Sequence, residues 1–176
     1  MENFAIRDAD ETHVEAIAAI YNDAVQHTTS IWNESTVDAA ERRAWLDARR
    51  RQTYPVLVAV SPLGEVLGYA SFGDWRAFDG YRHTVENSVY IRPASRGAGI
   101  GEALMRALIA RARQAGKHAI VAGIEARNRA SIRLHEKLGF TQAGFFPEVG
   151  VKFGQWLDLV FLQIILDARQ EPDSRP

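Results

Sequence analysis

The amino-acid sequence predicts a single domain of the α/β (α+β) class, in which helices flank a mixed and mostly antiparallel central sheet. Two β-rich runs separated by Pro62–Glu65 are typical of an antiparallel hairpin. Near the middle of the chain a strand, a glycine-bearing loop, an amphipathic helix and another strand follow in order, which is typical of mixed α/β folds. A chain of 176 residues suits one hydrophobic core. We expect residues 1–167 to form this domain and residues 168–176 to form a disordered tail.

The first expected elements are a strand and two helices. Phe4–Arg7 has the composition of a short strand, and Asp10 is expected to cap the helix that follows. A second helix is expected from about Thr36 to Gln52, with Ser35 as its N-cap. The first helix has apolar residues at helical spacing, namely Val14, Ile17, Ile20, Tyr21, Ala24 and Val25.

Three strands are expected next. Pro55–Ser61 and Val66–Phe72 form the hairpin, and Thr84–Ile91 forms the third strand. Successive side chains of a strand point to opposite faces. In the third strand one face carries Val85, Asn87, Val89 and Ile91, and the other carries Thr84, Glu86, Ser88 and Tyr90. Glu86 is therefore expected opposite the more apolar face.

The second half of the chain begins with a loop over Pro93–Gly101. A helix follows to about Ala115, and Gly116 is placed to end it in a left-handed conformation. The remaining expected elements are a strand over Ala119–Ile124, a helix over Arg129–Leu138 that Gly139 ends, and strands over Phe140–Phe146 and Trp156–Leu166.

The composition argues against several classes of protein. The chain has 21 basic and 22 acidic residues, so no overall charge attracts it to nucleic acid or to an anionic membrane. No apolar run approaches the roughly 18 residues of a membrane helix, and the N-terminus does not resemble a secretory signal. The chain has no cysteine and its five histidines lack metal-site spacing, so we expect no disulfide and no metal. These observations predict a soluble cytoplasmic protein.

The segment Val89–Ala103, VYIRPASRGAGIGEA, carries the strongest functional signal. Gly97, Gly99 and Gly101 lie between a strand and the start of a helix, where free backbone N–H groups can bind a phosphate. A P-loop would require Lys and then Ser or Thr after the last glycine, but Glu102 follows it. The spacing of a dinucleotide fingerprint fails as well. The loop therefore predicts an anion site of another kind.

The pattern Arg96-x-x-Gly99-x-Gly101 after a strand resembles the pyrophosphate-binding loop of the GNAT superfamily of acetyltransferases. Asn128 and the run SIRLHEKLGF are similar to a second GNAT block. TVENSVYI, RLHEKLGF and VGVKFGQWLDLVF further resemble the phosphinothricin and methionine sulfoximine N-acetyltransferases, which acetylate the α-amino group of small toxic amino acids. The resemblance covers most of the chain and implies a GNAT fold, acetyl-CoA as co-substrate and a homodimer.

The resemblance also implies a set of cofactor-binding residues. Backbone groups of Val89, Tyr90 and Ile91 would contact acetyl-CoA. Asn128 and Ser131 would lie beside its pantetheine arm. The phosphates would be held by the loop residues Arg96, Gly97, Ala98, Gly99, Ile100 and Gly101.

Acetyl transfer to an amine requires a base, polarisation of the thioester carbonyl and a proton for the departing thiolate. Glu86 is the candidate base, acting directly or through a water molecule. A backbone N–H near Val89 or Tyr90 is the candidate for polarising the carbonyl. His135 stands where many GNAT enzymes have tyrosine. It is a candidate to protonate the thiolate or to move the amine proton, and its alternative is a packed helix histidine.

A free amino acid also carries a carboxylate, which arginine binds well. Arg76 and Arg82 precede the strand of Glu86, and the sequence does not rank them. The resemblance implies that Trp75, Arg76, Phe78, Glu86, Asn87 and Ser88 contact the substrate. Lys152 and Trp156 are candidates to close the site from its far end, including across a dimer partner.

Two other functions remain open at this point. The acceptor could instead be another small amine, a polyamine, an aminoglycoside or a protein N-terminus. The chain could also be a non-catalytic sensor that binds acyl-CoA. A larger cationic acceptor would favour an acidic site, whereas the segment before Glu86 offers two arginines. The sequence thus favours a small amino acid.

Overall fold

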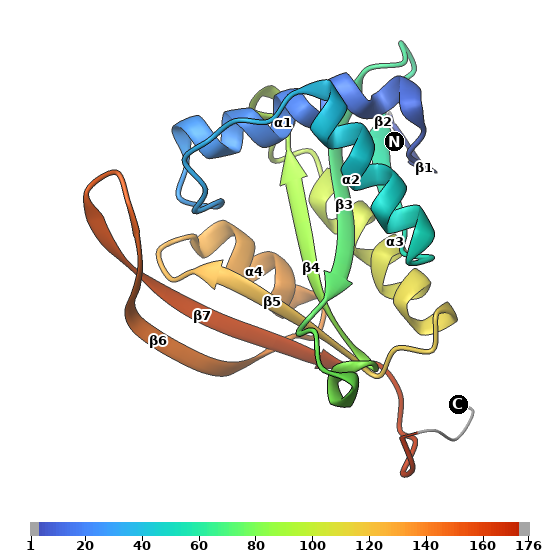
Figure 1. Cartoon of the computed structure of the whole chain (residues 1–176), viewed down its shortest axis with the longest axis vertical. Helices are drawn as coiled ribbons and strands as arrows, with labels where there is room; N and C mark the ends of the chain where they lie inside the picture. Colours follow the sequence, from blue (N-terminus) through green and yellow to red (C-terminus); the bar gives the residue numbers. More distant parts are fainter. Residues whose placement is uncertain (1–3, 173–176) are drawn as a thin grey trace.

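The computed structural model describes residues 4–172 and shows a seven-stranded sheet with helices on both faces (Figure 1). This confirms the expected fold class. Short 3₁₀ turns cover Glu11–His13, Asp79–Tyr81 and Pro93–Ser95. The main elements in chain order are β1 (Ala5–Asp8), α1 (Val14–His27), α2 (Ala39–Arg51), β2 (Val56–Val60), β3 (Val66–Asp74), β4 (Thr84–Ile91), α3 (Ile100–Gln114), β5 (Ala119–Glu125), α4 (Arg129–Lys137), β6 (Thr141–Lys152) and β7 (Gln155–Ile165).

The sheet has the strand order β1-β2-β3-β4-β5-β7-β6. All neighbouring strands are antiparallel except β4 and β5, which are parallel. That parallel pair is short, because it joins only Thr84–Glu86 to Ala119–Val121. Beyond it the two strands diverge, and Figure 1 shows β4 and β5 running apart like the arms of a V. The divergence leaves one edge of β4 unpaired in the middle of the sheet.

Helices cover the two faces of the sheet through separate apolar clusters. The fully buried Leu104 and Leu108 anchor α3 on one face, where Val85 of β4 also points. Ile17 of α1 and Leu46 of α2 pack on the opposite face. Burying a side chain of this size contributes about 1.5–3 kcal/mol. These clusters pack β4 between the helices, which positions the side chains along it.

The start of α2 differs from the sequence prediction. Asp38, rather than Ser35, is the N-cap, and it exchanges hydrogen bonds with Glu41 in a complete capping box. The Asn22 side chain bonds both the N–H and the C=O of Val37 at 2.8 Å. These bonds keep the backbone extended up to Asp38, so the helix begins three residues later than predicted.

Of the last two strands, β6 extends further than predicted, whereas β7 begins and ends one residue earlier than predicted. β6 continues past Phe146 to Lys152, because a register shift between Phe146 and Gly150 lets the strand accommodate Pro147. A proline has no N–H to donate to the neighbouring strand, and a bulge is a position where that hydrogen bond is not required. Phe153 and Gly154, both with positive φ, connect β6 to β7. The result is a long β6–β7 hairpin at one edge of the sheet.

The predicted tail lies partly outside the described residues. Within the described part, the guanidinium of Arg169 donates to the carbonyl of Gly116 at 2.8 Å. Asp167, the last residue of the predicted domain, bonds His118. Residues 173–176 are not described. Among residues 4–172, none of the helices has the length and apolar content to cross a membrane.

Candidate active site

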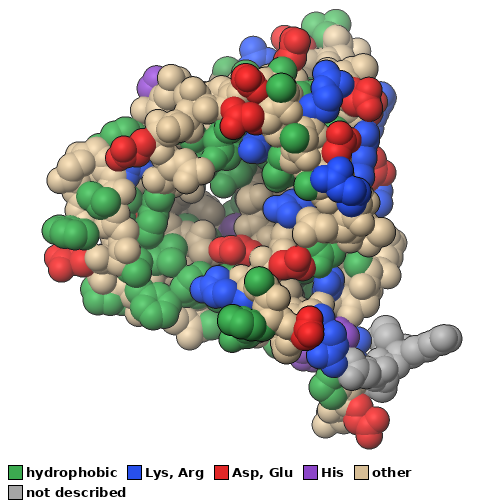
Figure 2. All heavy atoms as spheres, viewed as in Figure 1, with side chains coloured by type: hydrophobic (Ala, Val, Ile, Leu, Met, Phe, Trp, Pro, Cys, Tyr) green, Lys and Arg blue, Asp and Glu red, His purple; other side chains and the backbone are tan. Residues whose placement is uncertain are grey.

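A cavity of about 910 Å³ lies where β4 and β5 diverge. Its size is in the range of small-molecule sites. Figure 2 shows the molecule hollowed near the middle of one face, with hydrophobic side chains gathered on the side of β6 and β7. The cavity is lined by parts of α1 and its following loop, β4, the glycine loop, α3, β5, α4 and the β6–β7 turn.

The hydrogen-bond alternation of β4 decides which backbone groups face the cavity. The Arg92 amide donates to the Leu67 carbonyl at 2.9 Å. Residues of an antiparallel strand alternate in the side to which their backbone groups point. Even-numbered residues of β4 therefore pair with β3, and odd-numbered residues face β5. Because β5 has diverged by then, the N–H and C=O groups of Val89 and Ile91 are directed to the cavity.

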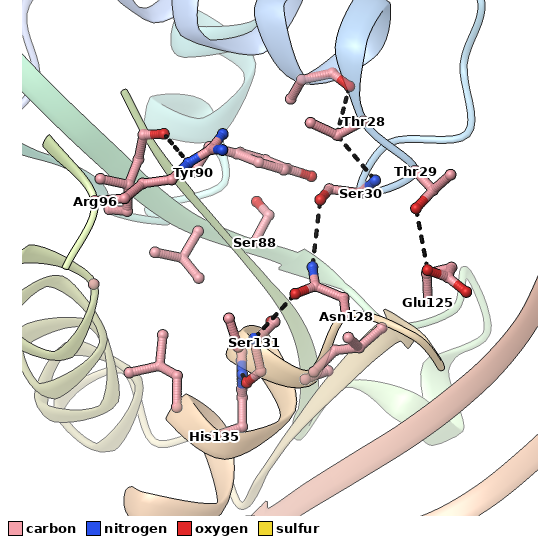
Figure 3. A pocket seen from close by; sticks show the side chains of 18 of the residues that line it. Thr28, Thr29, Ser30, Ser88, Tyr90, Arg96, Glu125, Asn128, Ser131 and His135 are labelled. Carbon is pink, nitrogen blue, oxygen red and sulfur yellow. Dashed lines mark hydrogen bonds between the residues drawn. The ribbon is translucent and has the colours of Figure 1, made fainter. Parts of the chain in front are cut away.

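Tyr90, predicted to contribute backbone groups, has a different placement. Its backbone is paired with Tyr69 on β3, and its ring packs 5.4 Å from the Tyr69 ring, centroid to centroid. Burial raises the pKa of its phenol well above the usual value. Tyr90 lines the cavity as a side chain on the α1 face, together with Ser88 (Figure 3).

The glycine loop forms the wide end of the cavity. Gly97 and Gly99 have φ values of 81° and 79°, a left-handed conformation that strains other residues. Gly99 caps α3 without a side chain, and the first helical bond runs from Ala103 N to Gly99 O. The amides of the first turn precede that bond and are available to an anion. Nothing lies within 4 Å of the place where a Gly97 Cβ would stand, so a phosphate can approach the backbone.

Asn128 forms part of the opposite wall (Figure 3). Its Oδ1 caps α4 by accepting from Ser131 N at 3.1 Å, and its Nδ2 donates to Ser30 Oγ at 3.4 Å. The neighbouring Thr29 hydroxyl donates to Glu125 at 3.1 Å. These contacts tie the loop after α1 to the ends of β5 and α4, across the cavity.

Lys152 holds the same loop from the β6–β7 hairpin. Its buried ammonium donates to the carbonyls of Val25 and Ile31. Val25 lies in the last turn of α1, where a positive charge is favourable. Desolvation lowers the pKa of this lysine. Trp156, the other candidate for closing the site, is 66% exposed.

His135 is buried and both of its ring nitrogens are engaged. Nδ1 is 2.8 Å from the Ser131 carbonyl oxygen, and Nε2 is 3.0 Å from Asn87 Nδ2. The ring also meets Phe140 edge-on. Burial lowers the pKa of His135, which favours the neutral ring. His135 and Asn87 both line the cavity, so the structure brings these two predicted residues into direct contact.

Glu86 lies on the other face of β4, next to the cavity but outside its lining. Its carboxylate is half-buried beside Gly123 of β5 and close to Phe161. Burial raises the pKa of Glu86, and the charge of Arg76 lowers it to a smaller degree. A carboxylate with a raised pKa is a better proton acceptor than an exposed one.

The predicted substrate residues before β4 also lie outside this cavity. Trp75 meets Phe161 edge-on at 5.1 Å, and the Arg76 guanidinium lies 4.0 Å from the centroid of the Trp75 ring. The Arg82 guanidinium donates to the Asp79 carbonyl at 3.2 Å. Phe78 is 77% exposed. The charge of Arg76 thus acts on Glu86, and Trp75 packs against Arg76 and Phe161, whereas one bond of Arg82 is to its own 3₁₀ segment.

Most of the predicted site residues thus surround one space. Those that line the cavity are Asn87, Ser88, Val89, Tyr90, Ile91, Arg96, Gly97, Gly99, Ile100, Gly101, Asn128, Ser131 and His135. Those outside its lining are Ala98, Trp75, Arg76, Phe78, Arg82 and Glu86. The two groups meet at β4, where Glu86 lies outside the lining and the next residues, Asn87 and Ser88, belong to it.

Sequence reasoning missed the lining residues that come from the loop after α1 and from the end of β5. Thr28, Thr29 and Ser30 have no spacing that marks them, and Glu125 follows the predicted end of its strand. An acidic residue at a strand end is the only signal that was available for Glu125. Across residues 4–172 no three His, Asp or Glu side chains are grouped so as to hold a metal ion.

Comparison with known proteins gives consistent matches. The acetyltransferase (GNAT) family model matches residues 17–140. An L-methionine sulfoximine/L-methionine sulfone acetyltransferase of Pseudomonas paraeruginosa is 60% identical over 93% of this chain and 95% of the relative. A phosphinothricin N-acetyltransferase of Alcaligenes faecalis is 39% identical over 93% of this chain and 81% of the relative. The structure of yncA from Salmonella typhimurium with its cofactor acetyl-CoA has a TM-score of 0.95, with 55% identity over 98% and 99% of the two chains.

Proposed function

This chain belongs to the acetyltransferase (GNAT) family and is an N-acetyltransferase; on that premise we propose that it transfers an acetyl group from acetyl-CoA to the α-amino group of L-methionine sulfoximine or L-methionine sulfone. Phosphinothricin is a further acceptor of the same type. The identity to the curated sulfoximine and sulfone acetyltransferases carries this proposal. We also propose a cytoplasmic location, which a chain without cysteine favours.

The residues of the cavity fit the donor. The open glycine loop and the first turn of α3 offer backbone amides to the diphosphate. The free edge of β4 offers the amides and carbonyls of Val89 and Ile91 to an arm that itself contains amide groups. Asn128 and Ser131 flank the same space. Acetyl-CoA, when bound, supplies the activated acetyl group as a thioester.

Glu86 and the edge of β4 would then act on the two reacting groups. An α-amino group must lose a proton before it attacks, at a cost of about 1–3 kcal/mol near neutral pH. Glu86 accepts that proton, directly or through a water molecule. The Val89 amide would donate to the thioester carbonyl, and loss of such a donor costs about 2.7–4 kcal/mol in other enzymes. Loss of carbonyl polarisation therefore costs at least about as much as deprotonation of the amine.

Arg76 is the best-placed group for the carboxylate of the acceptor. It lies over Trp75 and acts electrostatically on Glu86, so an amino acid whose amine meets Glu86 would have its carboxylate near Arg76. Trp75, Phe146 and Phe161 form an aromatic group on this side, with Phe146 and Phe161 in edge-to-face contact at 5.5 Å. This wall suits the side chain of a small amino acid.

An acceptor screen at fixed acetyl-CoA tests the proposal. Release of free thiol is expected with methionine sulfoximine, methionine sulfone and phosphinothricin. The amine that lacks the carboxylate of methionine sulfone is the matched control, and it should react far more slowly. Absence of turnover with all three amino acids would contradict the acceptor class. Cofactor binding without any acetyl transfer would instead favour an acyl-CoA sensor.

A second copy of this chain is proposed to cover the β6–β7 hairpin. This hairpin carries large apolar residues whose exposed fractions are between 49% and 66%, namely Phe145, Phe146, Val149, Val151, Phe153 and Trp156. Apolar patches of this kind mark interaction surfaces. The sedimentation coefficient should be that of a dimer, and Val149→Asp should shift it to that of a monomer. A monomeric wild type at micromolar concentration would contradict the proposal.

A further inference from the structure

A chain of hydrogen bonds from α4 to β4 fixes the orientation of the Asn87 amide. The Ser131 carbonyl can only accept, so the ring nitrogen 2.8 Å from it, Nδ1 of His135, must carry the proton. In a neutral ring Nε2 is then an acceptor. It takes a hydrogen from the Asn87 group 3.0 Å away, which must be Nδ2. The alternative orientation of the amide would place two acceptors against each other.

This orientation leaves one polar atom of Asn87 unsatisfied. The other neighbour of Nδ2 is Met105 Sδ at 3.6 Å. Oδ1 is buried and has no hydrogen-bond partner within residues 4–172. Buried acceptors without a partner are rare in folded proteins. Because Asn87 lines the cavity, a bound ligand is the natural source of the missing donor.

The position of Asn87 restricts which donor can reach it. If acetyl-CoA binds as proposed above, its diphosphate lies at Gly97–Gly101 and its arm follows the free edge of β4 inward. Asn87 is the innermost residue of β4 that lines the cavity. A thioester has acceptor atoms only. The nearest donor on the arm is the amide N–H that two methylene groups separate from the sulfur.

We propose that Oδ1 of Asn87 accepts a hydrogen bond from this last amide N–H of the thioester arm, and that His135 is a positioning residue that holds the Asn87 amide in the required orientation. The inference rests on the proposed donor and not on the identity of the acceptor amine. It also gives His135 a defined role. Its proton is directed to the Ser131 carbonyl, and its other nitrogen is occupied by Asn87, so it does not protonate the thiolate.

Binding of two unreactive ligands tests the contact with Asn87. One is a thioether analogue of acetyl-CoA, and the other is the same analogue with the last amide replaced by an ester, which has no N–H. Calorimetry should show the ester binding about tenfold more weakly to the wild type. For Asn87→Ala the affinities of the two ligands should differ less than twofold. If the alanine variant does not fold, the same binding test uses Asn87→Leu, because leucine is closer to asparagine in size.

Asn33→Ala is the matched control, because it makes the same substitution at an exposed asparagine that does not line the cavity. This variant should keep the tenfold difference in affinity between the two ligands. An equal ester penalty in the wild type and in Asn87→Ala would overturn the proposed hydrogen bond. Because no acceptor amine is present, this result is independent of whether the proposed amino-acid substrates react. If neither ligand binds the wild type, the proposed donor itself fails.

Two variants of His135 test its positioning role. A glutamine amide carries one donor and one acceptor on the same carbon, as the neutral ring does, whereas leucine carries neither. His135→Gln should therefore keep the ester penalty, and His135→Leu should lose it while remaining folded. If both variants kept the penalty and lowered kcat equally, His135 would act as a proton donor and the positioning role would be overturned.

Discussion

The Oε1 atom of Glu86 lies 3.0 Å from the position that a Cβ on Gly123 would occupy. Gly123 is on β5, just beyond the short segment that pairs with β4. The ring of Phe161 is also close, at 3.3 Å from the same position. A glycine at this point of β5 thus provides the space in which the carboxylate of Glu86 stands.

Replacing Gly123 by alanine should disturb Glu86 without touching the cofactor loop. The added methyl group must displace the carboxylate or the Phe161 ring, and such overpacking costs about 1–3 kcal/mol of stability. We expect kcat to fall severalfold and the KM for acetyl-CoA to stay within twofold. Steady-state kinetics and thermal unfolding check this. An unchanged kcat would show that the position of the carboxylate is unimportant.

Glu86→Gln should lower kcat by about 10²-fold, the low end for a positioned base, because the Val89 amide still polarises the carbonyl. In the wild type, kcat/KM should fall as pH decreases through the pKa of Glu86, which burial raises above the usual value of a glutamate. This acidic decline should be absent in Glu86→Gln. A pH–rate profile of both proteins distinguishes the outcomes.

The same substitution should stabilise the protein at neutral pH. A carboxyl group with a raised folded pKa contributes stability below its unfolded pKa, and this contribution is lost as pH rises through the folded pKa. Glutamine stays neutral at all pH values. The Tm difference between Glu86→Gln and wild type should therefore be more positive at about pH 8 than at about pH 4. A constant difference would contradict the effect of burial on this carboxylate.

Gly97→Asp should weaken acetyl-CoA binding by at least tenfold, because it places a carboxylate where the phosphates are expected. Gly116→Asp is the matched control. Gly116 also has positive φ, at 69°, and open space around it, but it lies at the far end of α3. Both variants should lose a similar amount of stability through backbone strain. Equal affinities for acetyl-CoA in the two variants would remove the phosphate assignment of the loop.

Arg76→Ala should raise the KM for the amino-acid acceptor about tenfold, and Arg82→Ala should raise it less. Arg76 lies beside Trp75 and Glu86, whereas Arg82 bonds the Asp79 carbonyl. With the acceptor that lacks a carboxylate, Arg76→Ala and wild type should react alike. If Arg82→Ala raised this KM more than Arg76→Ala does, Arg82 would be the residue that binds the carboxylate of the acceptor.

Lys152→Met should destabilise the protein by about 1–3 kcal/mol, because it leaves the buried carbonyls of Val25 and Ile31 unpaired. Urea unfolding measures this loss. Hydrogen exchange should increase selectively in the loop after α1. Uniform exchange rates would show that Lys152 does not hold that loop.

The sequence determined the class of fold and the family, and it predicted the phosphate-binding role of the glycine loop, because these depend on local patterns. Alternating polarity placed Glu86 and Asn87 on opposite faces of one strand, and the spacing of Gly97, Gly99 and Gly101 predicted an anion site. Such features need only residues close to one another along the chain.

The tertiary structure alone decided how distant segments complete the site. The divergence of β4 from β5 directs the backbone of Val89, and not of Tyr90, to the cavity. It also brings His135 to Asn87 and Thr29 to Glu125, which are 48 and 96 residues apart. Pairings at such separation depend on the packing of the helices on the sheet, and no local pattern in the sequence encodes them.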